Sequence, residues 1–219
     1  MKISKNKFWS DKILGWEKSR YNFKDKPIDK KRSNNSVNER LIVAKKLLLN
    51  LVTNKKILEI GCGSGLLAEE LIKAGAKSYL GYDFAETAIK NAQERCKRET
   101  KIRFNLGSVD EIKINEEYDV IFSLGLIDWL EEEEIKKLVE LSKDKIWLHS
   151  FSEKRQSLTQ LIHKIYVTCL YGYKNGMYIP RYDTKEDIKR YFQSDNINFF
   201  QSSKLSFGVI ASSLKFNND

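Results

Sequence analysis

Long apolar runs and paired cysteines are both missing from this sequence of 219 residues. No stretch of eighteen or more uncharged apolar residues occurs, so we expect no transmembrane helix. The first twelve residues carry lysines with no apolar stretch after them, which is not the pattern of a secretory signal. The three cysteines, Cys62, Cys96 and Cys169, have neither CxxC nor metal-ligand spacing. They predict reduced thiols in a cytoplasmic protein and no metal site.

Signs of a domain boundary are also missing. The chain holds two prolines, neither of them in a Ser- or Gly-rich linker, and it contains no internal repeat or low-complexity tract. A chain of this length can bury one sizeable core. We therefore expect a single domain over residues 1–219.

Positive charge is concentrated at the beginning of the chain. The net charge is +9, and residues 1–32 hold eleven Lys or Arg against four Asp or Glu. A basic arm of this kind can approach nucleic acid, an anionic membrane or an acidic substrate. We interpret residues 1–35 as a flap with a basic exterior that closes over bound ligands. Its aromatic residues are denser than is usual in a disordered segment: Phe8, Trp9, Trp16, Tyr21 and Phe23.

Helical and strand patterns alternate in the remainder of the chain. Apolar residues recur at helical spacing over 36–51, whereas short apolar runs such as 55–60 indicate strands. Strands that alternate with helices predict an α/β fold with a parallel sheet covered on both faces. The last two strand patterns, 197–205 and 207–216, have no helix between them. They predict a hairpin whose final strand is antiparallel.

The first strand pattern runs into three glycines at alternate positions, in the stretch ILEIGCGSGL. Gly61, Gly63 and Gly65 let the backbone turn sharply and let a ligand approach closely. A dinucleotide fingerprint needs a glycine at its sixth position, where Leu66 stands, and the Gly-Lys-Ser/Thr ending of a phosphate loop is missing. The pattern is instead an acid, Glu59, followed by alternating glycines.

A second acid, Asp83, ends the next strand pattern and is followed by Phe84. Because parallel neighbours bring their carboxyl ends to one edge of a sheet, both acids are expected where ligands bind. A carboxylate there can accept hydrogen bonds from a ribose diol, and Phe84 can lie against an adenine face. The alternative for Asp83 is a solvated acid that caps the following helix.

Taken together, Glu59-x-Gly61-x-Gly63-x-Gly65, the acid at Asp83 and the order of the strand patterns resemble class I S-adenosylmethionine-dependent methyltransferases. The resemblance is good over residues 36–150 and looser beyond them. It implies a Rossmann-like three-layer sandwich with a seven-stranded, mostly parallel sheet in the order 3-2-1-4-5-7-6. It also implies S-adenosyl-L-methionine as the cofactor and S-adenosyl-L-homocysteine as the product.

The resemblance carries a cofactor site onto this sequence by position. Glu59 and the loop Gly61-Cys62-Gly63 would face the methionine end of the cofactor, Asp83 would hold the ribose hydroxyls, and Phe84 would flank the adenine. Four further residues complete the predicted site: Arg40, Ser108, Val109 and Leu124.

Two of these four depart from the family's pattern or have a ready alternative. Ser108 stands where the family often has an acid for the adenine amino group, and Asp110 is the substitute that we consider. Val109 can still pack on the ring. Arg40 lies near the place where some relatives put an arginine on the cofactor carboxylate, with a solvated helix residue as the alternative.

The stretch after the fourth strand pattern narrows the class of molecule that can accept the methyl group. The Asn/Asp-Pro-Pro-aromatic, Pro-Cys and Glu-bracketed motifs of DNA-base and protein-arginine methyltransferases are all missing there. The stretch resembles a segment of small-molecule methyltransferases that ends in one or two histidines, and Asp128 takes the place of the first. Asp128 is therefore a candidate general base, with a helix N-cap as the alternative. His149, at the end of the fifth strand pattern, is the second catalytic candidate.

An amphipathic helix pattern follows the fifth strand, and we interpret residues 152–182 as an inserted lid. If its two ends meet at the mouth of the site, their cations favour an acidic acceptor, which Arg can grip through two hydrogen bonds. We assign substrate binding to Arg155, Arg181 and Tyr182, with solvated lid residues as the alternative. A membrane surface is the minor interpretation of this helix.

The sequence thus predicts a methyltransferase that acts on an O or N atom of a small, acidic metabolite. The alternatives are an RNA methyltransferase steered by the basic arm and a module that binds the cofactor without catalysis. We expect a small-molecule substrate, no nucleic-acid partner and no transmembrane segment, and we make no prediction of oligomeric state.

Overall fold

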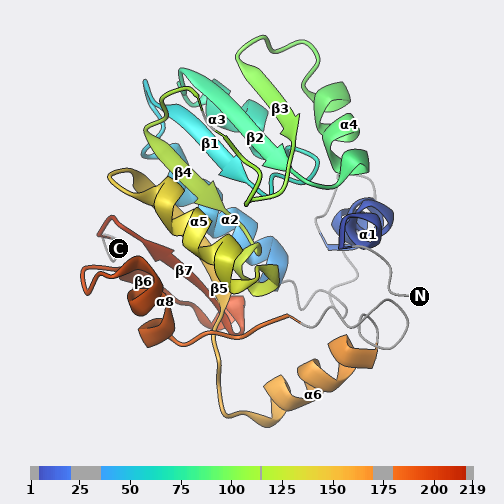
Figure 1. Ribbon diagram of the computed structural model, residues 1–219, viewed down its shortest axis with the longest axis vertical. Coiled ribbons are helices and arrows are strands. Elements are labelled where there is room, and N and C mark those ends of the chain that lie inside the picture. The colour runs from blue at the N-terminus through green and yellow to red at the C-terminus, as the bar shows by residue number, and fades with distance from the viewer. Residues whose placement is uncertain (1–4, 21–35, 114, 170–179, 216–219) are drawn as a thin grey trace.

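The computed structural model describes residues 5–20, 36–113, 115–169 and 180–215 of the chain (Figure 1). A seven-stranded sheet runs through the centre in the order β3-β2-β1-β4-β5-β7-β6. Neighbours from β3 to β5 pair in parallel, whereas β7 is antiparallel to both β5 and β6. The predicted strand order and the antiparallel final strand are therefore confirmed. The strands are β1 (Lys56–Ile60), β2 (Ser78–Asp83), β3 (Ile102–Leu106), β4 (Val120–Ser123), β5 (Ile146–Ser152), β6 (Asn198–Phe200) and β7 (Gly208–Ser212).

Helices cover both faces of this sheet because successive strand residues point to opposite sides. On β1, Ile57 packs in a core cluster with residues of α2, α3 and α4. Its neighbour Leu58 packs in a second cluster with residues of α5 and α8. The α-helices are α1 (Lys5–Arg20), α2 (Ser36–Leu49), α3 (Ala68–Lys73), α4 (Glu86–Arg95), α5 (Glu132–Ser142), α6 (Leu158–Val167) and α8 (Lys185–Phe192), and two short 3-10 helices are η1 (Ile127–Trp129) and η3 (Ser203–Leu205).

Local side chains set several of these boundaries. Thr184 accepts a hydrogen bond from the Asp187 N–H while the Asp187 carboxylate accepts one from the Thr184 N–H, so a capping box starts α8 as its sequence indicates. The strand expected over 197–205 ends early, at Phe200. There the Ser202 hydroxyl accepts a hydrogen bond from the Lys204 N–H and starts η3 instead.

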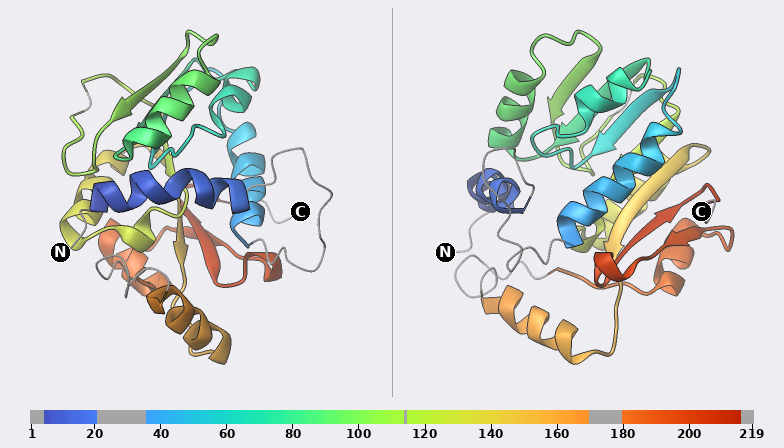
Figure 2. Two further views of the ribbon diagram at one scale, coloured as in Figure 1. Left: turned by 90° about the vertical axis from the view of Figure 1, so that its right-hand side faces the viewer. Right: turned by 180° about the vertical axis from the view of Figure 1, so that it is seen from behind.

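Helix α1, the described part of the predicted flap, crosses the carboxyl edge of the sheet (Figure 2). Phe8 and Trp9 are buried and pack with Ala85 and Ala88, which follow β2. The Thr87 hydroxyl also donates a hydrogen bond to the backbone oxygen of Ser10, at 2.6 Å. Aromatic burial therefore docks α1 against the sheet edge. Tyr21 and Phe23 lie outside the described residues.

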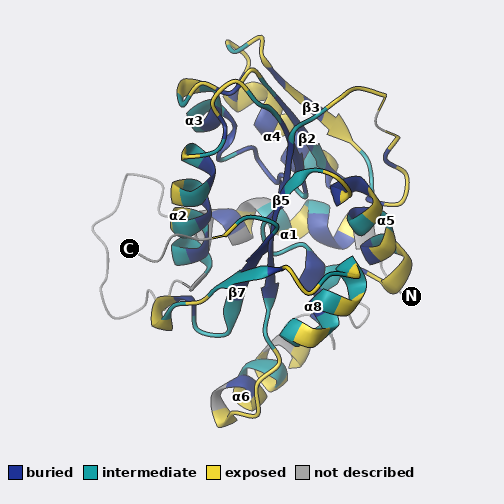
Figure 3. Cartoon of the chain, turned by 90° about the vertical axis from the view of Figure 1, so that its left-hand side faces the viewer, coloured by how far each residue is buried: buried dark blue, intermediate teal, exposed yellow. Residues whose placement is uncertain are grey.

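Helix α6 follows β5 and projects away from the buried strands (Figure 3). It is the inserted helix that the sequence predicts after the fifth strand. Among the described helices, none has the length and apolar character needed to cross a membrane.

Candidate functional site

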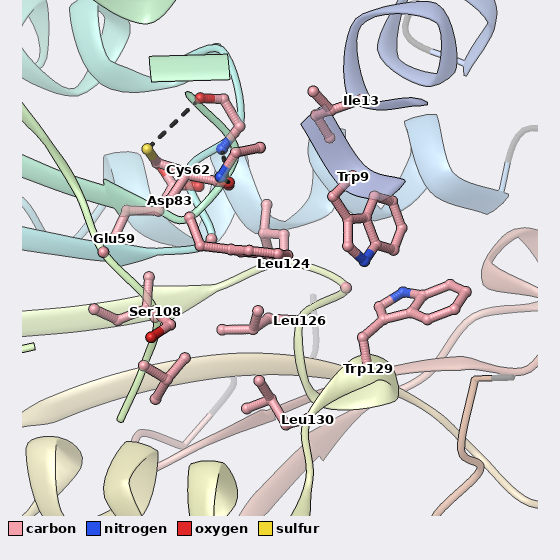
Figure 4. A pocket seen from close by; sticks show the side chains of 18 of the residues that line it. Trp9, Ile13, Glu59, Cys62, Asp83, Ser108, Leu124, Leu126, Trp129 and Leu130 are labelled. Carbon is pink, nitrogen blue, oxygen red and sulfur yellow. Dashed lines mark hydrogen bonds between the residues drawn. The ribbon is translucent and has the colours of Figure 1, made fainter. Parts of the chain in front are cut away.

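A cavity of about 540 Å³ lies at the carboxyl ends of β1, β2 and β4, bounded by α1 on one side (Figure 4). This volume is within the range of about 300–1,000 Å³ that is typical of small-molecule sites. Nine of the ten residues predicted to bind the cofactor line it. They are Glu59, Gly61, Cys62, Gly63, Asp83, Phe84, Ser108, Val109 and Leu124.

The glycine loop forms one wall of the cavity with a backbone that other residues adopt poorly. Gly63 has a φ of +53°, and a Cβ atom at this position would collide with Oε1 of Glu17. Gly61 has a φ of +72°, and its Cβ would lie 3.1 Å from the Leu126 side chain. The N–H groups of Gly61 and Cys62 both donate to the carbonyl of Tyr82, which fixes the loop to β2. The alternating glycines are therefore required by the loop's conformation and by its close neighbours.

Asp83 is buried at the end of β2, with 7% of its surface exposed. Its Oδ2 accepts a hydrogen bond from the Gly63 N–H at 2.9 Å, and its Oδ1 accepts one from the Ala85 N–H at 2.8 Å. Burial raises the pKa of Asp83 to about 6, against the opposing effect of these two backbone donors. Asp83 is therefore a held, buried carboxylate at the cavity wall, not the solvated acid of the alternative interpretation.

Glu59 is buried beside it and accepts a hydrogen bond from the Tyr79 hydroxyl. Burial raises the pKa of Glu59 to about 8; the Tyr79 hydroxyl opposes this rise, and the nearby carboxylates of Asp83 and Glu17 add to it. A group with this pKa holds its proton at neutral pH unless a cation comes close.

Glu17 is a cavity residue that the sequence analysis missed. It belongs to α1, has 5% of its surface exposed, and accepts a hydrogen bond from the Ser64 N–H through Oε1 at 2.9 Å. Burial raises the pKa of this carboxyl group. Trp9 and Ile13 line the same cavity. Because residues four apart share one face of a helix, the spacing 9, 13 and 17 is the signal that identifies this face.

The far end of the cavity carries a second unpredicted acid. The Ser108 hydroxyl donates a hydrogen bond to Oε2 of Glu111 at 2.7 Å. Asp110 and Glu111 both line the cavity, and Val109 is buried against the core cluster beneath it. Ser108 therefore stands together with two carboxylates at the place where the family's acid is expected.

The opposite end of the cavity has apolar and aromatic walls. Trp9 of α1 meets Trp129 of η1 edge to face, with ring centroids 4.9 Å apart. Ile13, Leu126 and Leu130 complete this end (Figure 4).

Acidic groups dominate the charge of the cavity. The described residues that line it include no Lys, Arg or His but six acids: Glu17, Glu59, Asp83, Asp110, Glu111 and Glu134. A concentration of carboxylates in a partly desolvated site attracts cations and repels anions. The same residues offer no arrangement suited to a metal ion, since no group of three or more His, Cys, Asp or Glu in the described chain has the required geometry.

Arg40 is the one predicted cofactor residue that does not line the cavity. It is buried in α2, and a Cβ atom at Gly125 would collide with its guanidinium group. Gly125, which does line the cavity, therefore stands between Arg40 and the cavity space.

Asp128 lies in η1 but points away from the cavity. Its Oδ1 accepts a hydrogen bond from the Ser152 N–H at 2.7 Å and its Oδ2 accepts one from the Ser152 hydroxyl at 2.8 Å. Burial raises the pKa of Asp128, and the Arg40 charge opposes this rise. Both oxygens thus tie η1 to the end of β5. This placement favours neither the base nor the N-cap interpretation, because Glu131 is the N-cap of α5.

His149 is fully buried in β5 and does not line the cavity. Its Nδ1 shares a hydrogen bond with Ser123 and its Nε2 shares one with Ser142, each at 2.9 Å. The ring also stacks on Trp147, with centroids 5.4 Å apart. Burial lowers the pKa of His149 to about 3, so the ring is neutral. The surroundings of His149 are those of a core residue, and its catalytic role stays a prediction that this geometry does not favour.

The three residues assigned to an acidic acceptor also lie outside the cavity. Arg181 is held by Asp183, by Tyr191 and by the carbonyl of Leu130. Arg155 pairs with Glu153 and donates to the Ser206 carbonyl. The Tyr182 hydroxyl shares a hydrogen bond with His163 of α6. Arg155 and Tyr182 are thus held near α6, whereas Arg181 is held against Leu130 and Tyr191 of α8, and none of the three lines the cavity.

Comparisons with known proteins show which proteins this chain resembles. Residues 57–144 match the family described as "Methyltransferase domain". The malonyl-[acyl-carrier protein] O-methyltransferase of Bacillus cereus is 38% identical over 76 residues, which cover 34% of this chain and 28% of that protein. The ubiquinone biosynthesis O-methyltransferase of Hydrogenovibrio crunogenus is 35% identical over 80 residues, which cover 35% of this chain and 33% of that protein. The chain thus spans about a third of the length of these curated relatives.

Among solved structures, magnesium protoporphyrin IX methyltransferase from Synechocystis PCC 6803 with bound SAH matches with a TM-score of 0.69 at 16% identity. The match covers 94% of this chain and 97% of that one. Residues 57–144 thus resemble a methyltransferase domain, and the fold of the chain is the Rossmann-like fold seen in the class I S-adenosylmethionine-dependent methyltransferases. The resemblance drawn from the glycine pattern and Asp83 is confirmed at the level of the fold.

Proposed function

We propose that this chain is an S-adenosylmethionine-dependent methyltransferase with a small-molecule acceptor, and that the cofactor binds in the cavity beside α1. The observation that carries the proposal is the meeting of the glycine loop, Glu59 and Asp83 in one acidic cavity. The family match over residues 57–144 and the methyltransferase names of the relatives support it.

The residues of the cavity fit this cofactor in shape and charge. When bound, S-adenosylmethionine supplies a methyl group on a positively charged sulfur, and it also carries an ammonium group. Glu17 and Glu59, beside the bare backbone of the glycine loop, suit the cationic methionine end. Asp83 suits the ribose hydroxyls, and Phe84 and Val109 suit the two sides of the adenine ring. Ser108, Asp110 and Glu111 offer acceptors for the adenine amino group: a serine hydroxyl and two carboxylates.

The aromatic end of the cavity indicates which kind of acceptor the chain suits. Trp9, Trp129 and Leu130 offer flat, apolar surfaces, and no described cation lines the cavity. We therefore favour an acceptor with an apolar or aromatic body over the acidic one that the sequence suggested. Oxygen is the favoured acceptor atom, because both relatives above are named O-methyltransferases. Their names refer to a malonyl carrier protein and to ubiquinone biosynthesis, and so give the RNA alternative no support.

The chain's own contribution to catalysis is then mainly alignment and exclusion of water. Trp9 and Ile13 of α1 cover the cavity, and Trp129 of η1 closes it from the sheet side. Side chains that fix two reactants in line and keep solvent out remove much of the barrier to a displacement reaction.

Calorimetry with S-adenosylmethionine tests the cofactor site. Asp83→Ala should weaken S-adenosylmethionine binding by about 2–4 kcal/mol, because hydrogen bonds to a buried carboxylate are lost. Asp195→Ala, which removes an acid that is 97% exposed and remote from the cavity, is the matched control. Unchanged affinity in Asp83→Ala would rule out the assigned site.

A labelled-methyl assay tests the activity itself. The protein is incubated with methyl-labelled S-adenosylmethionine and a cell extract separated into small molecules and RNA. Label in the small-molecule fraction is the expected result. Label in RNA would replace the proposal by its alternative, and binding without any transfer would identify a non-catalytic module.

A further inference from the structure

The apolar face of α6 is exposed, whereas a helix that packs on a protein core buries its apolar face. Five large apolar side chains form one stripe along it at spacings of three and four residues, and all are at least half exposed. They are Leu158 at 73%, Leu161 at 54%, Ile162 at 58%, Ile165 at 57% and Tyr166 at 55%.

Three polar side chains of α6 contact other described parts of the chain. Gln160 is 1% exposed; its Nε2 donates to the Glu153 carbonyl at 2.6 Å and its Oε1 accepts from the Arg155 N–H at 2.7 Å. His163 shares a hydrogen bond of 2.7 Å with the Tyr182 hydroxyl. Lys164 places its Nζ 5.0 Å from the centre of the Tyr182 ring. These contacts fix the rotation of α6, so that its apolar stripe faces outward.

An exposed apolar stripe of this size indicates a binding surface. Water disfavours contiguous apolar surface, and large patches of this kind on soluble proteins mark sites of protein or membrane interaction. The stripe continues past the end of the helix to Cys169, which is also exposed.

The charge around the stripe indicates which partner it suits. Residues 153–183 contain five Lys or Arg and two acids, Glu153 and Asp183, in a chain with a net charge of +9. Arg155 pairs with Glu153 and Arg181 with Asp183, so the segment keeps a net positive charge. Lys154 and Arg155, just before the helix, are exposed. A lipid surface with anionic headgroups attracts basic side chains and accepts apolar ones below them. A helix that combines an apolar stripe with flanking cations suits both the apolar acyl chains and the anionic headgroups of such a surface.

The position of α6 fits the same partner. The helix extends from the carboxyl end of β5, the edge of the sheet that α1 also crosses and where the cavity lies (Figures 1 and 2). A surface that receives α6 therefore meets this edge of the molecule.

We propose that α6 is an interfacial helix that docks this chain on a membrane containing anionic phospholipid. The apolar stripe lies among the lipid headgroups and the tops of the acyl chains, and the exposed Lys154 contacts the headgroup charges. This docking does not depend on the methyltransferase proposal. If both hold, the cavity edge faces the bilayer and can receive an apolar acceptor from it.

Vesicle flotation with the full chain tests the proposal. The probe is vesicles of phosphatidylcholine mixed with phosphatidylglycerol, compared with phosphatidylcholine alone. We expect retention on the anionic vesicles, with weaker retention on the neutral ones and after added salt. The double variant Leu161→Ser/Ile165→Ser should lose at least about tenfold in partitioning, because two apolar side chains no longer enter the interface. Lys154→Gln should produce a smaller loss on anionic vesicles only.

Matched controls separate the stripe from other causes. Ile42→Ser, which changes an apolar residue of α2 that is 49% exposed, should bind vesicles as the unchanged chain does. Circular dichroism should give all variants the same unfolding temperature, since the changed side chains are exposed. Absence of flotation, or flotation that survives Leu161→Ser/Ile165→Ser, would overturn the proposal. It would also be overturned if sedimentation found a dimer that this double variant converts to a monomer, because the stripe would then be an interface between two copies.

Discussion

The carboxylate of Glu17 accepts a hydrogen bond from the backbone N–H of Ser64 at 2.9 Å, which joins α1 to the end of the glycine loop. Its partners lie 47 positions apart in the chain. The bond places an acid from the N-terminal helix beside the backbone on which the cofactor is proposed to rest.

The first prediction concerns the charge of Glu17. Glu17→Gln should weaken S-adenosylmethionine binding by about five- to tenfold, as expected for one charge-assisted interaction. S-adenosylhomocysteine should lose less affinity, because its sulfur carries no charge. Calorimetry with both ligands measures the difference. Asp11→Asn, on the exposed side of the same helix, is the control. An equal loss for both ligands would indicate that Glu17 holds α1 against the glycine loop and does not recognise the charge of the ligand.

The second prediction concerns the space at Gly63. Gly63→Ala should lower the free energy of unfolding by about 2 kcal/mol or more, because alanine is strained at positive φ and its Cβ meets Glu17. In a Glu17→Ala background the loss should shrink, since only the backbone strain remains. Gly107→Ala is the control, because its Cβ would have no neighbour closer than 3.6 Å. Urea denaturation measures the unchanged chain and the four variants: Gly63→Ala, Glu17→Ala, the two combined, and Gly107→Ala. Equal losses in the two backgrounds would show that Glu17 and Gly63 are not in contact.

The third prediction follows from the pKa of Glu59, which burial raises from 4.5 to about 8. Between these values the folded chain holds a proton that the unfolded chain has released. The free energy of unfolding should therefore fall as pH rises from 4.5 to about 8. Asp83 acts in the same direction up to its pKa of about 6. Urea denaturation across this pH range, compared between the unchanged chain and Glu59→Gln, isolates the contribution of Glu59. The variant should lose part of the slope, whereas Glu117→Gln, at a site 92% exposed, should keep it. Identical slopes for the unchanged chain and Glu59→Gln would contradict the raised pKa.

The fourth prediction separates structure from catalysis at His149. His149→Leu leaves the Ser123 and Ser142 hydroxyls without this partner, so the free energy of unfolding should fall by about 2–4 kcal/mol. The transfer rate per folded molecule should change little once an acceptor is in hand. A loss of about a hundredfold or more in that rate, with the fold intact, would restore His149 as a catalytic residue.

Much of the fold could be predicted because it depends on short-range patterns. Strand runs, helical spacing and the capping residues at Thr184 are local in the sequence, and they fix the element order. The wall of the cavity formed by the glycine loop was predictable for a related reason. Glu59, Gly63 and Asp83 sit at the carboxyl ends of neighbouring parallel strands, and such ends meet at one edge of the sheet whatever lies between them.

The remaining site residues depend on long-range packing that no local pattern reveals. Glu17 enters the cavity because α1 docks across the sheet edge, and only the shared helix face with Trp9 and Ile13 hints at it. Asp128 and His149 have suitable chemistry and lie near strand ends, yet their side chains turn toward Ser152 and Ser123. The direction of a side chain at a strand end depends on its packing neighbours, so position in the sequence alone could not place it.

The distribution of the three thiols gives the protein a built-in reporter position. Cys62 is buried within the glycine loop and Cys96 is buried at the C-terminal end of α4, whereas Cys169 is exposed just beyond α6. Burial raises the pKa of both Cys62 and Cys96, which further lowers their reactivity. A maleimide fluorophore added to the folded chain will therefore attach at Cys169, with no engineered cysteine. The dye's emission then reports directly whether the end of the apolar stripe is in water or in lipid.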